Sequence, residues 1–75
     1  MKSVKHKRMS VIVFEPKWAK DKKVDKRHPL KYGEHVLYLG DIPNVPGHCA
    51  VAKYEGQVVW LVHPEDFRKA KESEL

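Results

Sequence analysis

Short apolar runs separated by turn-forming residues are the main pattern along this 75-residue chain. β-branched and aromatic residues recur in four of these runs, each of which is too short for an ordinary helix. Glu55-Gly56 separates the last two runs by a spacing that fits a two-residue hairpin turn. The pattern therefore predicts four strands, at Ser10–Phe14, His35–Leu39, Cys49–Tyr54 and Gln57–Val62.

The segments between these runs are polar or rich in proline and glycine. Residues 15–33 are dense in charge, which favours a long charged loop; a weak helix over residues 18–26 is the alternative. Residues 41–47 contain two prolines, which remove hydrogen-bond donors from a strand, so they predict a second loop.

The end of the chain has the signals of a short helical turn. Pro64 suits the first position of a helix, and Glu65-Asp66 would place negative charge near its positive end. This predicts a helical turn that starts at Pro64 and reaches Lys71 at the furthest. We expect one folded domain over residues 9–71, between a mobile basic tail at 1–8 and a frayed C terminus at 72–75.

The alternation along the predicted strands assigns the core. Side chains two residues apart lie on the same face of a strand, so Trp60 shares a face with Val58 and Val62. The predicted core residues are Leu37, Leu39, Val51, Trp60 and Phe67.

Length and cysteine content narrow the class of protein. A domain of 75 residues is too small for a large enclosed active site. Cys49 is the only cysteine, which excludes an intramolecular disulfide and favours a reducing, cytoplasmic setting. The longest apolar run, Val58–Val62, is far shorter than the ~18 residues of a membrane span, so we expect a soluble protein without a membrane partner.

The residues that commonly carry catalysis or metals show no suitable spacing. His48 and Cys49 are adjacent, so they would face opposite sides of a strand, and the other histidines lack zinc-site spacing. No pairing of a nucleophile with a base, and no glycine-rich phosphate loop, is evident. We therefore expect a non-enzymatic protein with no cofactor, metal or small-molecule substrate.

Charge divides the chain into two unlike halves. Residues 1–31 contain eleven Lys/Arg and three Asp/Glu, a net charge of +8, whereas residues 32–75 contain four and seven, a net charge of −3; together they give the overall +5. One half is therefore suited to an anionic partner. The other half holds most of the apolar runs and is expected to form the folded scaffold.

The basic segment contains the candidate binding residues. Lysine and arginine neutralise phosphates, and exposed aromatic rings stack on bases. We expect nucleic acid, either RNA or DNA, or a nucleoprotein machine such as the ribosome or RNA polymerase, to be the partner. A lysine-rich loop that serves only solubility is the plainer alternative. The candidate nucleic-acid contacts are Trp18, Lys20, Lys22, Lys23, Lys26, Arg27, Lys31 and Tyr32.

A second hypothesis is a protein-docking regulator or inhibitor that binds an acidic surface of a larger protein. Ile42 and Val45 lie in the proline loop at 41–47 and have no alternating partners, so they offer a stiff apolar tip. The same two residues could instead fold back onto the domain.

The order strand, long loop, strand, proline loop, strand, tight turn, strand, helical turn resembles the SH3-like small β-barrel. The clearest likeness lies in three segments of the sequence, Lys31-Tyr32-Gly33-Glu34-His35-Val36, Gly47-His48-Cys49-Ala50-Val51-Ala52 and His63-Pro64-Glu65-Asp66-Phe67. The resemblance implies a single mainly β barrel in which Phe67 closes one end.

The tyrosine-rich, tryptophan-pair and proline-tyrosine motifs of proline-peptide-binding SH3 domains are absent, so that activity is not expected. The chain is similar in size and basicity to KOW-type modules, which bind RNA, ribosomes or RNA polymerase, but it lacks their tight glycine spacing. It also resembles a small barrel protein of photosystem I that serves as a docking and assembly module. A fold likeness alone does not assign a function.

Overall fold

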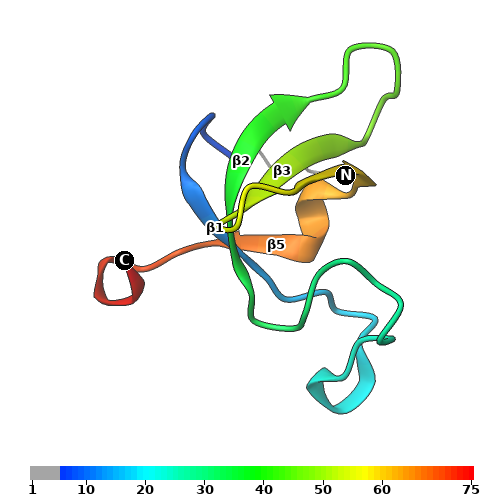
Figure 1. The fold of residues 1–75 in the computed structure, drawn as a ribbon, viewed down its shortest axis with the longest axis vertical. Coiled ribbons are helices and arrows are strands. Elements are labelled where there is room, and N and C mark those ends of the chain that lie inside the picture. Colours follow the sequence, from blue (N-terminus) through cyan, green and yellow to red (C-terminus); the bar gives the residue numbers. More distant parts are fainter. Residues whose placement is uncertain (1–5) are drawn as a thin grey trace.

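A computed structural model describes residues 6–75, whose strands form one antiparallel sheet. The strand order is β4-β3-β2-β1-β5, so β4 and β5 form its edges (Figure 1). The mainly β fold with a short C-terminal helical turn is therefore confirmed. The strands are β1 (Val11–Phe14), β2 (His35–Asp41), β3 (Cys49–Lys53), β4 (Val58–Val62) and β5 (Phe67–Lys69), and the 3-10 turns are η1 (Lys20–Lys22), η2 (Pro64–Asp66) and η3 (Glu72–Glu74).

The β3–β4 hairpin agrees with the predicted strand pair, but its turn is longer than expected. The Lys53 N–H donates to the Gln57 carbonyl (2.7 Å), and the Gly56 N–H donates to the Lys53 carbonyl (2.8 Å). Gly56 has a φ of 101°, a left-handed conformation that glycine adopts without steric cost. Three residues, Tyr54 to Gly56, thus make the connection, with glycine in the last position as in a bulged hairpin.

The strand β5 is absent from the sequence prediction. The helical turn starts at Pro64 as expected, but it ends at Asp66, and the chain is extended from Phe67 instead of helical to Lys71. β5 pairs with β1, where Phe67 lies opposite Phe14. The residues around Phe67–Lys69 give no sign that β1 will pair with them. This explains why the strand was missed.

The inward face of β2 is opposite to the predicted one. Val36 and Tyr38 are buried, whereas Leu37 and Leu39, predicted as core residues, are only half-buried. Both faces of this strand are apolar, so alternation alone could not choose between them. Pairing with β1 makes the choice, because Val36 lies opposite the fully buried Ile12.

Trp60 was also predicted in the core, and the structure places it outside with 64% of its surface exposed. The register between β3 and β4 shifts, because Cys49 pairs with Val62 and Val51 pairs with Val59. β4 therefore carries one extra residue over this stretch, which is a β-bulge. Trp60 alternates with the buried Val59 and therefore faces solvent. The bulge then breaks the period of two that the prediction assumed, so that Val62, and not Leu61, returns to the core side.

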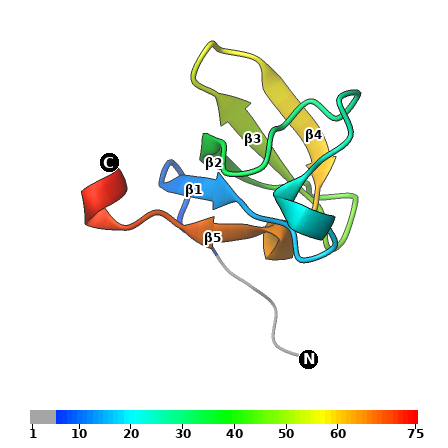
Figure 2. The same ribbon diagram turned by 90° about the horizontal axis from the view of Figure 1, so that it is seen from below.

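The core lies inside the curved sheet and is entirely apolar among the described residues (Figure 2). Val51 and Phe67 lie in it as predicted. Burial raises the pKa of the Cys49 thiol to about 12, so this side chain is a neutral core residue at physiological pH. The cluster consists of Ile12, Phe14, Leu30, Val36, Tyr38, Cys49, Val51, Val59, Val62 and Phe67.

The C-terminal residues, expected to be frayed, form the turn η3, which is joined to the sheet by ion pairs. The Arg68 guanidinium donates to both carboxylate oxygens of Glu74 (2.7 Å each), and its Nε lies 2.9 Å from a Glu15 oxygen. This bidentate contact with Arg68 holds the pKa of Glu74 down, at about 2. The end of the chain is thus tied to β5.

We expect Glu74→Gln to lower the melting temperature at pH 7 and to have no effect near pH 2. The lowered pKa of Glu74 means that its ion pair stabilises the fold fully above the unfolded-state pKa of about 4.5. That contribution falls as the pH drops towards 2, because the carboxylate becomes protonated. Thermal unfolding at several pH values measures the difference.

Glu72→Gln is the matched control for this prediction. Glu72 lies in the same turn, is exposed and forms no ion pair within residues 6–75. It should therefore change the melting temperature little at any pH. A loss caused by Glu74→Gln that is equally large at pH 2 and pH 7 would contradict the ion-pair explanation.

The N-terminal tail was predicted as residues 1–8, of which residues 1–5 lie outside the described part. His6 contacts two parts of the domain: its Nε2 lies 2.9 Å from the Pro64 carbonyl oxygen, and its ring is 5.4 Å from that of Tyr38. Met9 donates its N–H to the Tyr38 carbonyl. No helix within residues 6–75 has the length and apolar character needed to cross a membrane.

Candidate functional site

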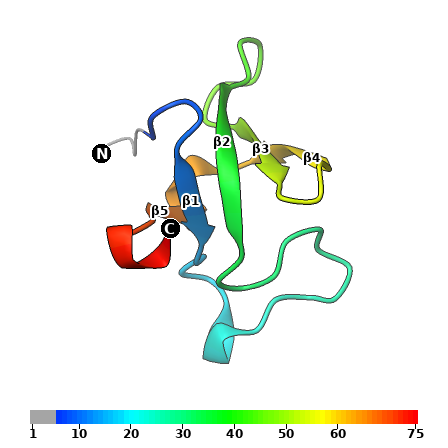
Figure 3. The same ribbon diagram turned by 60° about the vertical axis from the view of Figure 1, so that its left-hand side comes forward.

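The basic segment forms a long loop between β1 and β2, and we call residues 15–33 the basic loop. It leaves the sheet at the end that these two strands share (Figure 3). Its one regular element is the 3-10 turn η1, and no helix spans residues 18–26. The loop is therefore free to present side chains in several directions.

Apolar contacts hold the basic loop in place. Leu30 is 1% exposed and belongs to the core, and Val24 packs against the same cluster. The His28 ring stacks on Phe14 with 5.1 Å between centroids, while its Nδ1 accepts the Leu30 N–H (3.1 Å). Because these contacts fix the second half of the loop, its cations have a defined position relative to the sheet.

A lysine from the sheet joins the basic loop to the hairpin. The Lys53 ammonium donates to the Pro29 carbonyl (2.8 Å) and lies 3.1 Å from a Glu55 oxygen and 3.6 Å from a Glu34 oxygen. These carboxylates raise its pKa. Lys53 is thus a structural cation whose charge is already balanced.

Trp18 is exposed and yet held in one orientation. Its Nε1–H donates to an Asp66 carboxylate oxygen (3.2 Å), and its ring meets the edge of Phe14 at 6.2 Å and lies 6.1 Å from His28. Even so, 54% of its surface is exposed. A flat aromatic surface is therefore available for stacking without a large loss of side-chain freedom on binding.

The predicted cationic contacts share two properties, exposure and the absence of any ion pair within residues 6–75. These side chains can thus form ion pairs with a ligand without breaking an existing ion pair. Tyr32, the second predicted stacking residue, is half-buried at the base of the loop. The cations are Lys20, Lys22, Lys23, Lys26, Arg27 and Lys31.

The tip of the basic loop is conformationally strained. Asp21 and Lys22 have φ values of 55° and 58°, in the left-handed region that side chains other than glycine rarely adopt. The Lys23 N–H donates to the Lys20 carbonyl (3.0 Å) and closes this turn. Such strain is frequent at binding sites.

A hollow of about 700 Å³ lies on the inner side of the basic loop. Its lining combines lysines with apolar and aromatic residues. Its volume is typical of small-ligand pockets. The lining residues are Lys22, Val24, Asp25, Lys26, His28, Pro29, Leu30, Lys31, Tyr32 and Lys53.

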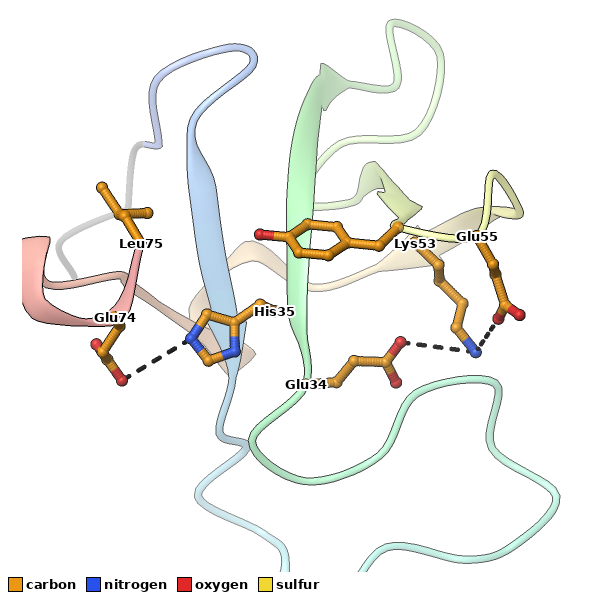
Figure 4. Close-up of a pocket in the computed structure, with 7 residues that line it drawn as sticks. Glu34, His35, Lys53, Glu55, Glu74 and Leu75 are labelled. Carbon is orange, nitrogen blue, oxygen red and sulfur yellow. Dashed lines mark ion pairs between the residues drawn. The ribbon is translucent and has the colours of Figure 1, made fainter.

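A second hollow, of about 590 Å³, differs in charge (Figure 4). Three glutamates, Glu34, Glu55 and Glu74, line it, and its one lysine is the balanced Lys53. His35 lies 4.0 Å from Glu74 and has no hydrogen-bond partner for its Nε2 within residues 6–75. This acidic surface is unsuited to a polyanion, so it limits the candidate interface to the basic loop.

The structure places the alternative docking residues in a closed loop. Ile42 and Val45 are half-buried. The Val45 N–H donates to the Ile42 carbonyl (3.1 Å), and the Ile42 N–H donates to the His48 carbonyl (3.1 Å). The His48 ring packs against His63 with 4.4 Å between centroids. This loop therefore does not present the exposed apolar tip that the docking hypothesis expects.

Sequence reasoning missed an exposed apolar group on the edge strand β4. Val58 and Leu61 are 38% and 57% exposed and lie on the strand that carries the exposed Trp60. Leu61 also has a left-handed φ of 61°. The only sequence signal for this group was the unbroken apolar run Val58–Val62, which predicted a buried strand instead.

Within residues 6–75, no three His, Cys, Asp or Glu side chains are grouped in a way that could hold a metal ion. Comparisons with protein-family models, with curated proteins and with solved structures found no match to this chain.

Proposed function

We propose that this protein binds nucleic acid through the basic loop, either directly or within a nucleoprotein machine such as the ribosome or RNA polymerase. The observation that carries the proposal is the combination of six exposed cations, which form no ion pair within residues 6–75, with the fixed ring of Trp18. Cations of this kind seek phosphates, and a fixed exposed ring stacks on bases. In this proposal the protein is a binding module and not an enzyme.

The fold relationship belongs to the same proposal. The strand order β4-β3-β2-β1-β5, with a long loop after β1 and a 3-10 turn before β5, supports an SH3-like barrel. The burial of Phe67 within the core fits the residue that closes such a barrel. The family-level likeness to KOW-type modules adds only analogy.

Protein docking through Ile42 and Val45 receives less support. Both residues are half-buried, and the backbone hydrogen bonds of their loop close it on itself. The basic loop, in contrast, offers charges that are free within residues 6–75. Nucleic acid is therefore the class of partner that we propose.

We expect binding to oligonucleotides of unrelated sequence to weaken steeply with salt. Six phosphate contacts predict a slope of log affinity against log salt of about −5 on duplex DNA and about −4 on a single strand. Fluorescence anisotropy of labelled oligonucleotides, measured over a roughly fourfold range of salt from about 50 to about 200 mM, gives this slope. A slope near zero, or no binding at the lowest salt, would refute the proposal.

A pulldown from extract with and without nuclease separates the two classes of partner. In our proposal nuclease removes the co-purifying material, because nucleic acid connects it to the protein. A single stoichiometric protein that remains after nuclease would favour direct protein docking instead.

A further inference from the structure

The proposed function uses the lysines of the basic loop but assigns no role to the hollow that they line. It encloses about 700 Å³, which exceeds the needs of a lone phosphate and suits a ligand with both a charged and a flat part. Its walls come from one continuous stretch, residues 22–32, together with Lys53 of β3. Leu30 and His28 hold this stretch to the core and so give the hollow its shape.

The charges around the hollow favour an anion. Lys22, Lys26 and Lys31 are exposed and form no ion pair within residues 6–75. Lys53 is already balanced, and Asp25 is the one carboxylate of the lining. The Asp25 carboxylate accepts the backbone N–H of Arg27 (2.8 Å) and so stabilises the turn. Its negative charge offsets one of the lysines around the hollow. A net excess of lysine remains.

The apolar part of the hollow suits a planar ring. Val24 and Pro29 contribute apolar surface above the buried Leu30, and Tyr32 and His28 contribute aromatic rings. His28 also lies 6.1 Å from Trp18, which connects the hollow to the exposed stacking surface of the loop. Lysines beside an aromatic and apolar wall match the two chemical parts of a nucleotide, its phosphate and its base.

We propose that this hollow holds one unpaired nucleotide of a bound strand, so that the protein prefers single-stranded nucleic acid to duplex. The inference rests on the proposed function and specifies its substrate class. A base that is paired inside a duplex cannot enter the hollow unless its pair is broken, which costs energy. An interface that used charge alone would have the opposite preference, because a duplex has the higher density of phosphates.

The test compares a labelled 12-nucleotide single strand of mixed sequence with its duplex, at equal salt. We expect the single strand to bind at least about tenfold more tightly, the effect of one stacked base. Adenosine monophosphate, added in about millimolar excess, should not displace the strand, since it offers one phosphate contact in place of several.

Tyr32→Ala should weaken single-strand binding about tenfold more than it weakens duplex binding, because it removes a ring from the hollow. Tyr32→Phe should restore the preference, which shows that a general loss of structure is not the cause. Tyr54→Ala is the matched control: Tyr54 is 69% exposed at the hairpin and does not line the hollow.

The outcomes separate the inference from the function on which it rests. Equal or tighter binding of the duplex by the unchanged protein would overturn the inference and leave nucleic-acid binding intact. Displacement of the strand by adenosine monophosphate would also overturn it, since the hollow would then serve free nucleotides. If neither oligonucleotide binds, the proposed function falls as well.

Discussion

Replacing Phe14 by alanine is expected to remove most of the stability of this domain. Phe14 is 1% exposed and contacts three rings, those of Phe67, His28 and Trp18. Truncation of a buried phenylalanine costs about 3–5 kcal/mol. A core in a domain of this size rarely supplies more than about 3–5 kcal/mol in total. Urea unfolding followed by circular dichroism measures the loss.

Trp60→Ala is the matched control, because it removes a larger aromatic side chain that is 64% exposed. It should change the free energy of unfolding by no more than about 0.5 kcal/mol. The pair of variants therefore checks the correction to the predicted core. If Trp60→Ala destabilises the fold as much as Phe14→Ala, the outward position of Trp60 on β4 is wrong.

Reversing two charges in the basic loop has the largest expected effect on binding. The double variant Lys22→Glu/Lys23→Glu removes two exposed cations and adds two carboxylates that repel phosphates. At up to about 1 kcal/mol for each exposed charge contact, loss and repulsion together predict a decrease in affinity of about 100-fold. The thermal stability should stay close to that of the unchanged protein, since neither lysine forms an ion pair within residues 6–75.

The control for this experiment is Lys69→Glu/Lys71→Glu. Both lysines are exposed, and the change in net charge is identical. Lys69 pairs with Ile12 near the start of β1, and Lys71 follows β5, whereas the basic loop begins at the other end of β1. Affinity for a labelled oligonucleotide should fall much less in the control. Equal losses in the two variants would mean that net charge, and not the loop, determines binding.

The sequence predicted those parts of the fold that depend on residues close together in the chain. Glu55-Gly56 predicted the hairpin, and its strands are present with a turn one residue longer. The parts that were missed depend on contacts distant in the chain. β5 exists because β1 offers it hydrogen bonds, and the inward face of β2 follows from the pairing of Val36 with Ile12. Neither partner can be read from the residues next to these strands.

The candidate site divides in the same way. Its cations were visible in the sequence, because charge and exposure depend little on the fold. The contacts that fix the loop were not visible in the sequence. Trp18 donates a hydrogen bond to Asp66, 48 residues away, and the Pro29 carbonyl accepts one from Lys53. The hollow between these contacts depends on the buried position of Leu30. Composition could therefore mark the loop as a candidate binding segment, but it could not show that the loop has a defined shape.

The position of β1 between β2 and β5 has a consequence for biosynthesis. One of the two partners of β1, β5, is made only after β2, β3 and β4 have followed β1 out of the ribosome. Until then Phe14 lacks Phe67, and Trp18 lacks its hydrogen bond to Asp66. The lysine-rich loop is therefore exposed on the growing chain well before its stacking surface is assembled, and a nascent chain can attract polyanions only through its charge.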